Sequence, residues 1–233
     1  VLTLSGSDTV ANYQSALASI TYDNLSNDPS TTHRSLTWKV SDGIDESNTT
    51  ITSIFITSGN NPPVLTSGHT LSYIENDGAV PIDPSLAVSD IDSLSLHYAT
   101  VSLGISYISG EDVLGYTGLL TPTWNTTSGI LTLSGSDTVA NYESALTSIT
   151  YENRSEAPTP TPRIVTWTVN DGTNTSNPVT TTIDVLSVND PPLITSGATQ
   201  VYTEGDGKVV IDDEIDIIDV DNIGLVKASI RIA

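Results

Sequence analysis

Apolar and polar residues alternate along several short stretches of the chain. The pattern is clear in residues 35–41 (SLTWKVS), where Leu36, Trp38 and Val40 fall on one face, and again in residues 50–57. Alternation with a period of two is typical of a strand with one buried face. An Asp-Gly pair follows the tryptophan strand and is a common tight turn, so the two strands are predicted to form a hairpin. Further strands are predicted at 69–74, 79–88, 95–103, 129–133, 164–170 and 179–186.

The pattern changes after residue 135, where the strand-like GILTLSG of residues 129–135 gives way to SDTVANYESALTSI. In this second stretch Ala, Tyr, Ala and Leu recur at helical spacing behind a Ser and an Asp. Ser and Asp are favoured at the residue that precedes a helix, so we expect a short helix capped by one of them. Many strands, one short helix and frequent turn residues predict an all-β fold, namely tandem antiparallel β-sandwiches.

The chain contains an internal repeat with a period of about 129 residues. The twelve letters of residues 2–13 (LTLSGSDTVANY) recur at 131–142, and the same shift aligns the chain without a gap to its end. Fixed-period copying is the mark of tandem units. Proline pairs at 62–63 and 191–192 mark the linkers, because tandem prolines suit neither a helix nor a sheet interior. We therefore predict the C-terminal part of one repeat in 1–60, a complete repeat in 61–190 and the N-terminal part of a third in 191–233.

Composition and charge narrow the classes of partner. The chain has no cysteine, so it is not a disulfide framework, and its Ser- and Thr-rich repeats favour an extracellular or cell-surface location. A net charge of −21 argues against binding nucleic acid, since phosphates need basic residues, and makes cations the natural partners. No apolar run reaches membrane-spanning length, so we expect no membrane insertion in this stretch.

Carboxylates and amides gather at the linkers and at predicted loops. Asp90 and Asp92 occupy alternate loop positions, from which two carboxylates can face one Ca²⁺, an ion that takes roughly six to eight oxygen ligands. An ordinary acidic turn is the alternative. Asp171 belongs to an Asp-Gly pair, which is itself a common hairpin turn, so both interpretations of this residue stay open. The other positions of this kind are Asn60, Asn61, Glu75, Asn189, Asp190, Glu204, Asp219 and Asp221.

Three stretches together resemble a known family. TWTVNDGTNTSNPVTTTIDVLSVNDPP (166–192) looks like the last two strands and linker of a cadherin-type repeat, and YIENDGAVPIDPSLAVSDID (73–92) looks like the start of one. The middle, 141–172, is similar to bacterial cadherin-like and chondroitin-sulfate-proteoglycan-type repeats of large RTX-like surface adhesins. The resemblance implies a Greek-key sandwich of cadherin or immunoglobulin type, with Ca²⁺ bound where one repeat meets the next.

The resemblance also implies how the oxygen ligands divide between two junctions. In that family the first-strand Glu lies at the far end of its domain, and the Asp-x-Asp loop and the hairpin Asp lie at the near end. The chain departs from the family at Asn61, where an acid is expected, and it lacks a clear Asp-Arg-Glu motif, for which Asp23-Asn24 and Glu152-Asn153 are the nearest candidates. The implied metal ligands are Asn60, Asn61, Asp90, Asp92 and Asp171 at the first junction, and Glu75, Asn189, Asp190, Asp219 and Asp221 at the second.

These observations predict a structural extender and adhesion segment of a secreted or surface-anchored bacterial adhesin, made rigid by Ca²⁺ at the junctions. Its expected partners are calcium ions and the adjacent repeats of the same chain. No catalytic motif is recognised, so we expect no enzyme activity. The alternative is an adhesion module that itself binds a cell-surface glycan or protein, including another copy of the array. The partial repeats 1–60 and 191–233 also raise the hypothesis that they complement each other between molecules.

Overall fold

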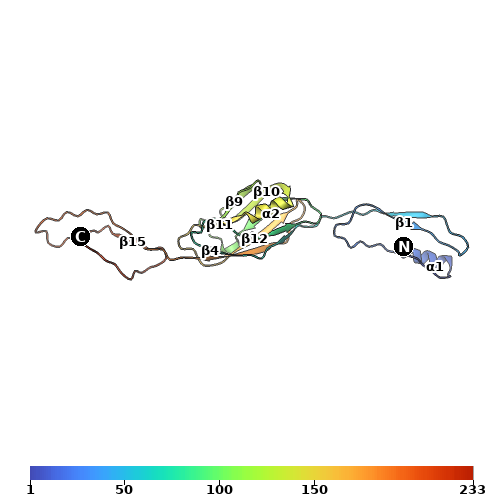
Figure 1. Cartoon of the computed structure of the whole chain (residues 1–233), viewed down its shortest axis with the longest axis horizontal. Coiled ribbons are helices and arrows are strands. Elements are labelled where there is room, and N and C mark those ends of the chain that lie inside the picture. Colours follow the sequence, from blue (N-terminus) through green and yellow to red (C-terminus); the bar gives the residue numbers. More distant parts are fainter. Residues whose placement is uncertain (233) are drawn as a thin grey trace. The chain divides into compact units, whose positions relative to one another are not determined.

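The structure is a computed structural model that describes residues 1–232, and it divides into two compact units between Gly59 and Asn60. Strands dominate the larger unit, and the α-helices of the described residues are two short ones (Figure 1). Every buried side chain of residues 1–232 lies between residues 63 and 185. The predicted all-β class is therefore confirmed, while the division into three repeat segments stays a prediction.

The larger layer of the complete repeat is a six-stranded sheet. Its strands, in spatial order, are β4 (Thr70–Ile74), β13 (Val179–Leu186), β12 (Arg163–Asn170), β7 (Ser95–Ser102), β10 (Ile130–Thr138) and β9 (Thr121–Asn125). The predicted hairpin forms, since β12 and β13 pair antiparallel. One pair departs from the predicted antiparallel arrangement, because β13 and β4 run parallel from Thr182 opposite Thr70 to Leu186 opposite Ile74.

The second layer consists of shorter strands. The sheet order is β5 (Val80–Pro81), β11 (Thr150–Asn153) and β8 (Asp112–Gly115), and β3 (Val64–Thr66) pairs separately with β6 (Ala87–Ser89). A single 3₁₀ turn, η1 (Gly104–Ser106), follows β7. The single strand predicted at 79–88 is thus two strands, separated by a turn that contains Pro84, which has no N–H to donate to a ladder.

Aromatic residues on inward-facing strand positions fill the space between the layers. Trp167 on β12 and Tyr151 on β11 are fully buried, and the rings of Tyr73 and Tyr151 meet edge to face with centroids 4.9 Å apart. Such an arrangement suits the opposite charge of ring faces and edges. Tyr73 belongs to the six-stranded sheet and Tyr151 to the second layer, so this contact joins the two sheets.

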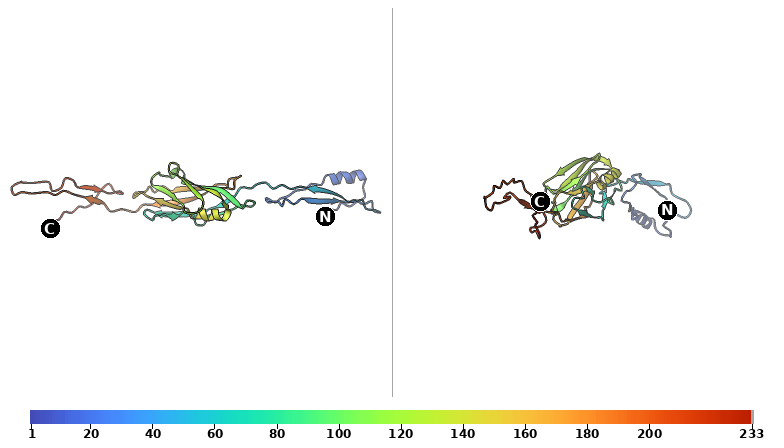
Figure 2. Two further views of the ribbon diagram at one scale, coloured as in Figure 1. Left: turned by 90° about the horizontal axis from the view of Figure 1, so that it is seen from above. Right: turned by 60° about the vertical axis from the view of Figure 1, so that its left-hand side comes forward.

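A helix follows β10 and connects the layers. Helix α2 (Val139–Thr147) buries Tyr142, Ala145 and Leu146, and it lies on the outside of the strands in both views of Figure 2. The helix was predicted, but the predicted capping residue was wrong. Thr138 caps the helix, because its Oγ1 accepts the amide hydrogen of Asn141 at 3.2 Å. The preceding Ser136 and Asp137 still belong to β10, so they lie too early in the chain to cap the helix.

A buried carboxylate fastens the two layers together. Asp83 accepts hydrogen bonds from Ser67 Oγ at 2.7 Å and Thr181 Oγ1 at 3.1 Å, and Thr181 Oγ1 in turn accepts from Trp167 Nε1 at 3.0 Å. Burial raises the pKa of Asp83, but the hydrogen bonds from Ser67, Ser85 and Thr181 together hold it below its usual 3.8. The carboxylate therefore stays ionised inside the fold at neutral pH.

A second buried network contains the one Arg of the core. Arg163 and Asp112 have no exposed side-chain surface, and Arg163 Nε lies 3.3 Å from Asp112 Oδ1. The same oxygen accepts from Tyr151 at 2.6 Å and Asn153 at 2.7 Å, while Arg163 Nη1 donates to the carbonyl of Thr161 at 2.6 Å. A buried ion pair survives only when such additional bonds offset the loss of water.

The smaller unit, residues 1–59, contains α1 (Val10–Ala18) and the antiparallel pair β1 (Arg34–Trp38) and β2 (Thr50–Ile54). Trp38 Nε1 donates to Thr52 Oγ1 at 2.9 Å, which reproduces the bond between Trp167 and Thr181 one repeat later. No side chain of residues 1–59 is fully buried. At the other end of the chain β14 (Leu193–Thr195) and β15 (Asp216–Ile218) form a similarly exposed antiparallel pair.

Candidate metal sites

The first junction is the set of five residues predicted to surround the Pro62-Pro63 linker, and the structure brings all of them together. The linker lies against the loop after β6, because the backbone N–H and the side-chain Nδ2 of Asn61 both donate to Asp92 Oδ2, at 2.9 and 2.8 Å. Asn60 Nδ2 donates to Asp171 Oδ2 at 2.7 Å, in the turn between β12 and β13. Ser93 and Asn174, which were not predicted, bond Asn60 Oδ1 at 3.3 Å and its carbonyl at 3.0 Å.

The Asp-x-Asp loop of the first junction is held by its own backbone. Asp90 Oδ1 accepts the amide hydrogens of Asp92 at 3.1 Å and Ser93 at 2.8 Å. The other oxygen of each carboxylate lacks such a donor: Asp90 Oδ2 and Asp92 Oδ1 are buried and accept no hydrogen bond from any described residue. A buried carboxylate oxygen without a donor is costly, so these two atoms are positions where a cation would be favoured.

Hydrogen bonds control the protonation of the other carboxylate oxygens at this junction. The Asn61 side chain and backbone amide lower the pKa of Asp92. Burial raises the pKa of Asp171, but the bonds from Asn60, Asn174 and Thr173 lower it further than burial raises it. Both groups therefore carry a negative charge at neutral pH, as ligands of a hard cation must.

The second junction is the corresponding set around Pro191-Pro192. Its linker repeats one bond of the first junction, because the N–H of Asp190 donates to Asp221 Oδ2 at 2.5 Å. Asp219 Oδ1 accepts from the amides of Asp221 at 3.1 Å and Asn222 at 2.8 Å, as Asp90 does in the first junction. Asn222 Nδ2 donates to Asn189 Oδ1 at 2.7 Å.

Glu75, at the end of β4, ties the complete repeat to the start of this linker. Its side chain is 4% exposed, and Glu75 Oε1 accepts the N–H of Val188 at 2.6 Å. The other oxygen, Oε2, is buried without any donor among the described residues, and so is Asp190 Oδ2. The second junction therefore also contains two buried carboxylate oxygens without partners.

A further carboxylate belongs to this second cluster and was missed from the sequence. Loss of water around the carboxyl raises the pKa of Asp190, and so do the negative charges of Glu156, Asp221 and Asp219. Glu156 lies in the loop after β11, where it accepts from Asn76 Nδ2 at 3.2 Å. The residue one repeat earlier is Asn27, so no repeated acid draws attention to the position.

Three of the four residues considered for a missing Asp-Arg-Glu motif are engaged elsewhere. Glu152 pairs with Arg154 at 3.2 Å on the surface, and Asn153 is buried against Asp112. Asn24 Oδ1 accepts from the backbone of Ser26 at 2.9 Å. The bonds described for these three side chains do not involve residues of either junction.

Carboxylates alone do not complete a metal site in the described chain. Within residues 1–232 no three His, Cys, Asp or Glu side chains converge closely enough to hold an ion by themselves. Ca²⁺, however, also accepts amide and backbone carbonyl oxygens and binds in irregular geometry. Each junction offers unpartnered carboxylate oxygens next to Asn side chains and linker carbonyls, and this donor chemistry fits Ca²⁺ and not a soft transition metal.

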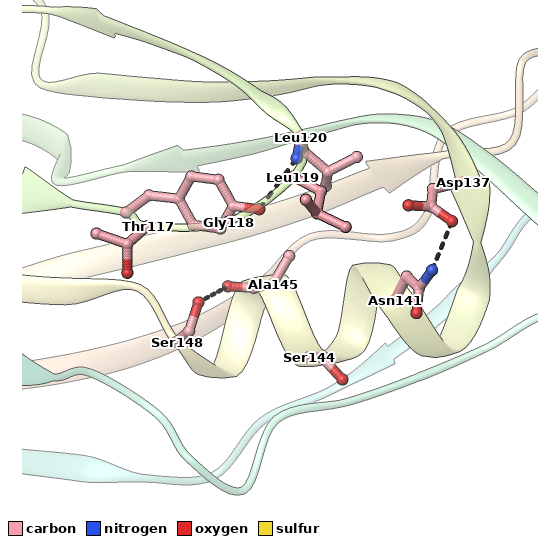
Figure 3. Close-up of a pocket in the computed structure, with 10 residues that line it drawn as sticks. Thr117, Gly118, Leu119, Leu120, Asp137, Asn141, Ser144, Ala145 and Ser148 are labelled. Atoms are coloured by element: carbon pink, nitrogen blue, oxygen red, sulfur yellow. Dashed lines mark hydrogen bonds between the residues drawn. The ribbon is translucent and has the colours of Figure 1, made fainter.

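The described chain also has a groove beside α2, with a volume of about 240 Å³ (Figure 3). The loop 116–120 forms one wall, where Tyr116 OH accepts the N–H of Leu120 at 3.3 Å. Asn141, Ser144 and Ser148 line the helix side.

Neither α-helix of residues 1–232 has the length and apolar content needed to cross a membrane.

The fold and the clusters define a class: an acidic, all-β protein with an internal sequence repeat, in which carboxylates and amides gather at the linkers. A comparison with known proteins found a similarity over part of the chain. Over 101 residues, or 40% of its length, the chain is 27% identical to halomucin of Haloquadratum walsbyi (strain DSM 16790 / HBSQ001). That stretch is about 1% of halomucin, so the chain spans a very small part of this relative. No protein-family profile matches the chain.

Proposed function

We propose that the chain is an extender segment of a large secreted or surface-anchored adhesin, in which Ca²⁺ at the junctions holds successive repeats in line. One observation carries the proposal: nearly all of the buried carboxylate oxygens that lack a hydrogen-bond partner belong to residues at the linkers. Of the five such oxygens in the described chain, four belong to Glu75, Asp90, Asp92 and Asp190. The coarser part, a surface-associated extracellular protein, is supported by the similarity to halomucin.

The mechanism is an equilibrium between bent and aligned linkers. Clustered carboxylates repel one another, and this repulsion disfavours the compact arrangement at a linker. An ion that binds only when ligands from both sides of the linker converge stabilises the aligned state by its binding free energy. Extracellular calcium modules bind with Kd values of about 10⁻⁴ to 10⁻³ M, so the segment would stiffen in calcium-containing fluid and soften in its absence.

Calcium titration of the whole chain tests this proposal. Addition of calcium to chelator-treated protein should raise the thermal midpoint and increase the radius of gyration measured by small-angle X-ray scattering. Magnesium at the same ionic strength is the control, because it demands a more regular geometry than these clusters offer. If neither the midpoint nor the radius responds to calcium, the chain does not work in this way.

A double substitution locates the effect. Asp90→Ala with Asp92→Ala removes both unpartnered oxygens of the first junction and leaves the second junction intact. The variant should lose part of the calcium response and keep the rest. Complete retention of the response would exclude the first junction, and complete loss would show that the two junctions do not act separately.

Binding of a glycan or protein by the repeat itself is the second candidate function, and the groove beside α2 favours it. The groove combines apolar Leu119 and Leu120 with the polar side chains of Asn141 and Ser148 (Figure 3). A ligand that uses it would be lost in Ser148→Trp, which fills the groove, and retained in Asp90→Ala. A glycan array probed with both variants separates this function from the first.

A further inference from the structure

The two junctions share equivalent hydrogen bonds from their backbone amides but differ in the side chain of one linker residue. In each, the linker residue before the proline pair donates its N–H to the second Asp of the Asp-x-Asp loop: Asn61 to Asp92 at 2.9 Å, and Asp190 to Asp221 at 2.5 Å. The first Asp of each loop accepts from the same two amides downstream. The linker side chain is an amide in the first junction and a carboxylate in the second.

This difference changes what the linker can do without a cation. Asn61 Nδ2 donates a second bond to Asp92 Oδ2, at 2.8 Å, so a neutral donor that belongs to the protein partly offsets the carboxylate charge. The ionised side chain of Asp190 has no hydrogen to donate, and its Oδ2 is buried without a partner among the described residues. Negative charges on Glu156, Asp219 and Asp221 act on Asp190 as well, and no Lys or Arg forms an ion pair there among the described residues.

Glu75 also anchors the second junction to the rest of the repeat, and its unpartnered oxygen indicates that a ligand binds there. Glu75 is buried, bonds Val188 two residues before Asp190, and keeps Oε2 unpartnered. A buried carboxylate whose second oxygen meets no donor is stable only if a cation or proton comes to it. This observation is independent of the acidic loop on the other side of the linker.

We propose that the junctions are of two kinds: the first is an amide clasp, formed by Asn61 and Asp92, that holds its linker without a cation, and the second is a joint that becomes ordered only when a divalent cation binds. This inference rests on the proposed function and adds its regulation. In an array that contains both kinds, withdrawal of calcium releases the linkers of the acidic joints and leaves the linkers of the clasps bound to the loop that follows them.

Exchange of the two linker residues tests the inference. Asn61→Asp should turn the clasp into a cation-dependent joint and tighten calcium binding at the first junction about tenfold, since affinity in oxygen-ligand sites follows ligand charge. Asp190→Asn should create a clasp at the second junction and weaken its calcium binding by a similar factor. Asn48→Asp and Asp45→Asn make the same charge changes at exposed positions of residues 1–59 and are the controls.

Two measurements on the whole chain separate the possible failures. Isothermal titration calorimetry counts calcium sites and their affinities, and hydrogen exchange followed by mass spectrometry reports the linker amides with calcium and with chelator. We expect the Asn61 amide to be protected under both conditions and the Asp190 amide only with calcium, with the two patterns exchanged in the double variant Asn61→Asp, Asp190→Asn.

The outcomes are distinct. Calcium binding with equal protection of both linkers, unaltered by the exchange, would overturn the inference and leave the proposed function in place. Absence of any calcium binding in the unaltered chain would overturn both. Protection that follows the Asn or Asp identity, with the controls unchanged, supports the two kinds of junction.

Discussion

Substitution of Glu75 is predicted to stabilise the protein without calcium and to destabilise it with calcium. Glu75→Gln keeps an oxygen that can accept from Val188 and replaces the buried, unpartnered charge by a neutral amide. An unsatisfied buried polar group costs about 1 to 3 kcal/mol, and more when it is charged. In chelator the substitution should therefore stabilise the repeat by about 1 kcal/mol or more, which raises the thermal midpoint by roughly 2 to 4 °C per kcal/mol.

In calcium the order should reverse. A free calcium concentration about 100-fold above Kd adds about 2.7 kcal/mol to the stability of a protein that binds it only when folded. This gain corresponds to a rise of roughly 5 to 11 °C per site for a chain of this size, and Glu75→Gln should lose most of the gain that comes from the second junction. The stability curves of the two proteins, plotted against calcium concentration, are expected to cross.

Differential scanning calorimetry in chelator and along a calcium series measures both effects. Glu204→Gln is the matched control, because Glu204 occupies the same position one repeat later but is exposed. It should change neither the midpoint in chelator nor the response to calcium. The reasoning is refuted if Glu75→Gln lowers the midpoint in chelator, or if it leaves the calcium response unaltered.

Three further predictions concern the fold itself. Asp112→Ala leaves the buried Arg163 charge unpaired and should cost about 3 to 5 kcal/mol in urea unfolding, whereas Asp112→Leu with Arg163→Met should recover most of it; equal losses would contradict this. The lowered pKa of Asp83 means that its contribution to stability is complete above its unfolded value of 3.8 and disappears as the pH falls through the lower folded value. Asp83→Asn should therefore flatten the acid side of the stability profile, and an unchanged profile would count against the buried charge. Thr138→Ala should cost about 0.5 to 2 kcal/mol through loss of the helix cap, while Thr9→Ala, its counterpart outside the complete repeat, should not affect the same calorimetric transition.

Some strands were predictable because burial alternates along them. The prediction of a strand at 179–186 matches β13 residue for residue, and Val165, Trp167 and Val169 of β12 are buried on the face that the equivalent Leu36, Trp38 and Val40 had indicated. The same signal is weak for β9, where Pro122 interrupts the run. That strand lies at the edge of its sheet, where a missing N–H is tolerated.

The pairing of distant strands was beyond the sequence. Nothing in the letters of β4 indicates that it lies parallel to β13, because register between strands so far apart depends on the packing of the whole core. Likewise, Glu156 reaches the second cluster through an irregular loop, and its counterpart Asn27 carries no charge. By contrast, the loops with repeated Asp pairs could be located, since the copy repeats them at the same distance from each proline pair.

The parallel pairing of β4 and β13 bears on how the proposed extender would respond to tension. β13 is the last strand before the second linker, whereas the short β3 lies between the first linker and β4. β4 and β13 lie side by side over five residue pairs. A pull on the two linkers acts in opposite directions along strands that run the same way, so the hydrogen bonds between them are sheared together and do not open one after another. Bonds loaded in common resist greater force than bonds opened in turn, so this pairing is expected to resist stretching of the proposed extender.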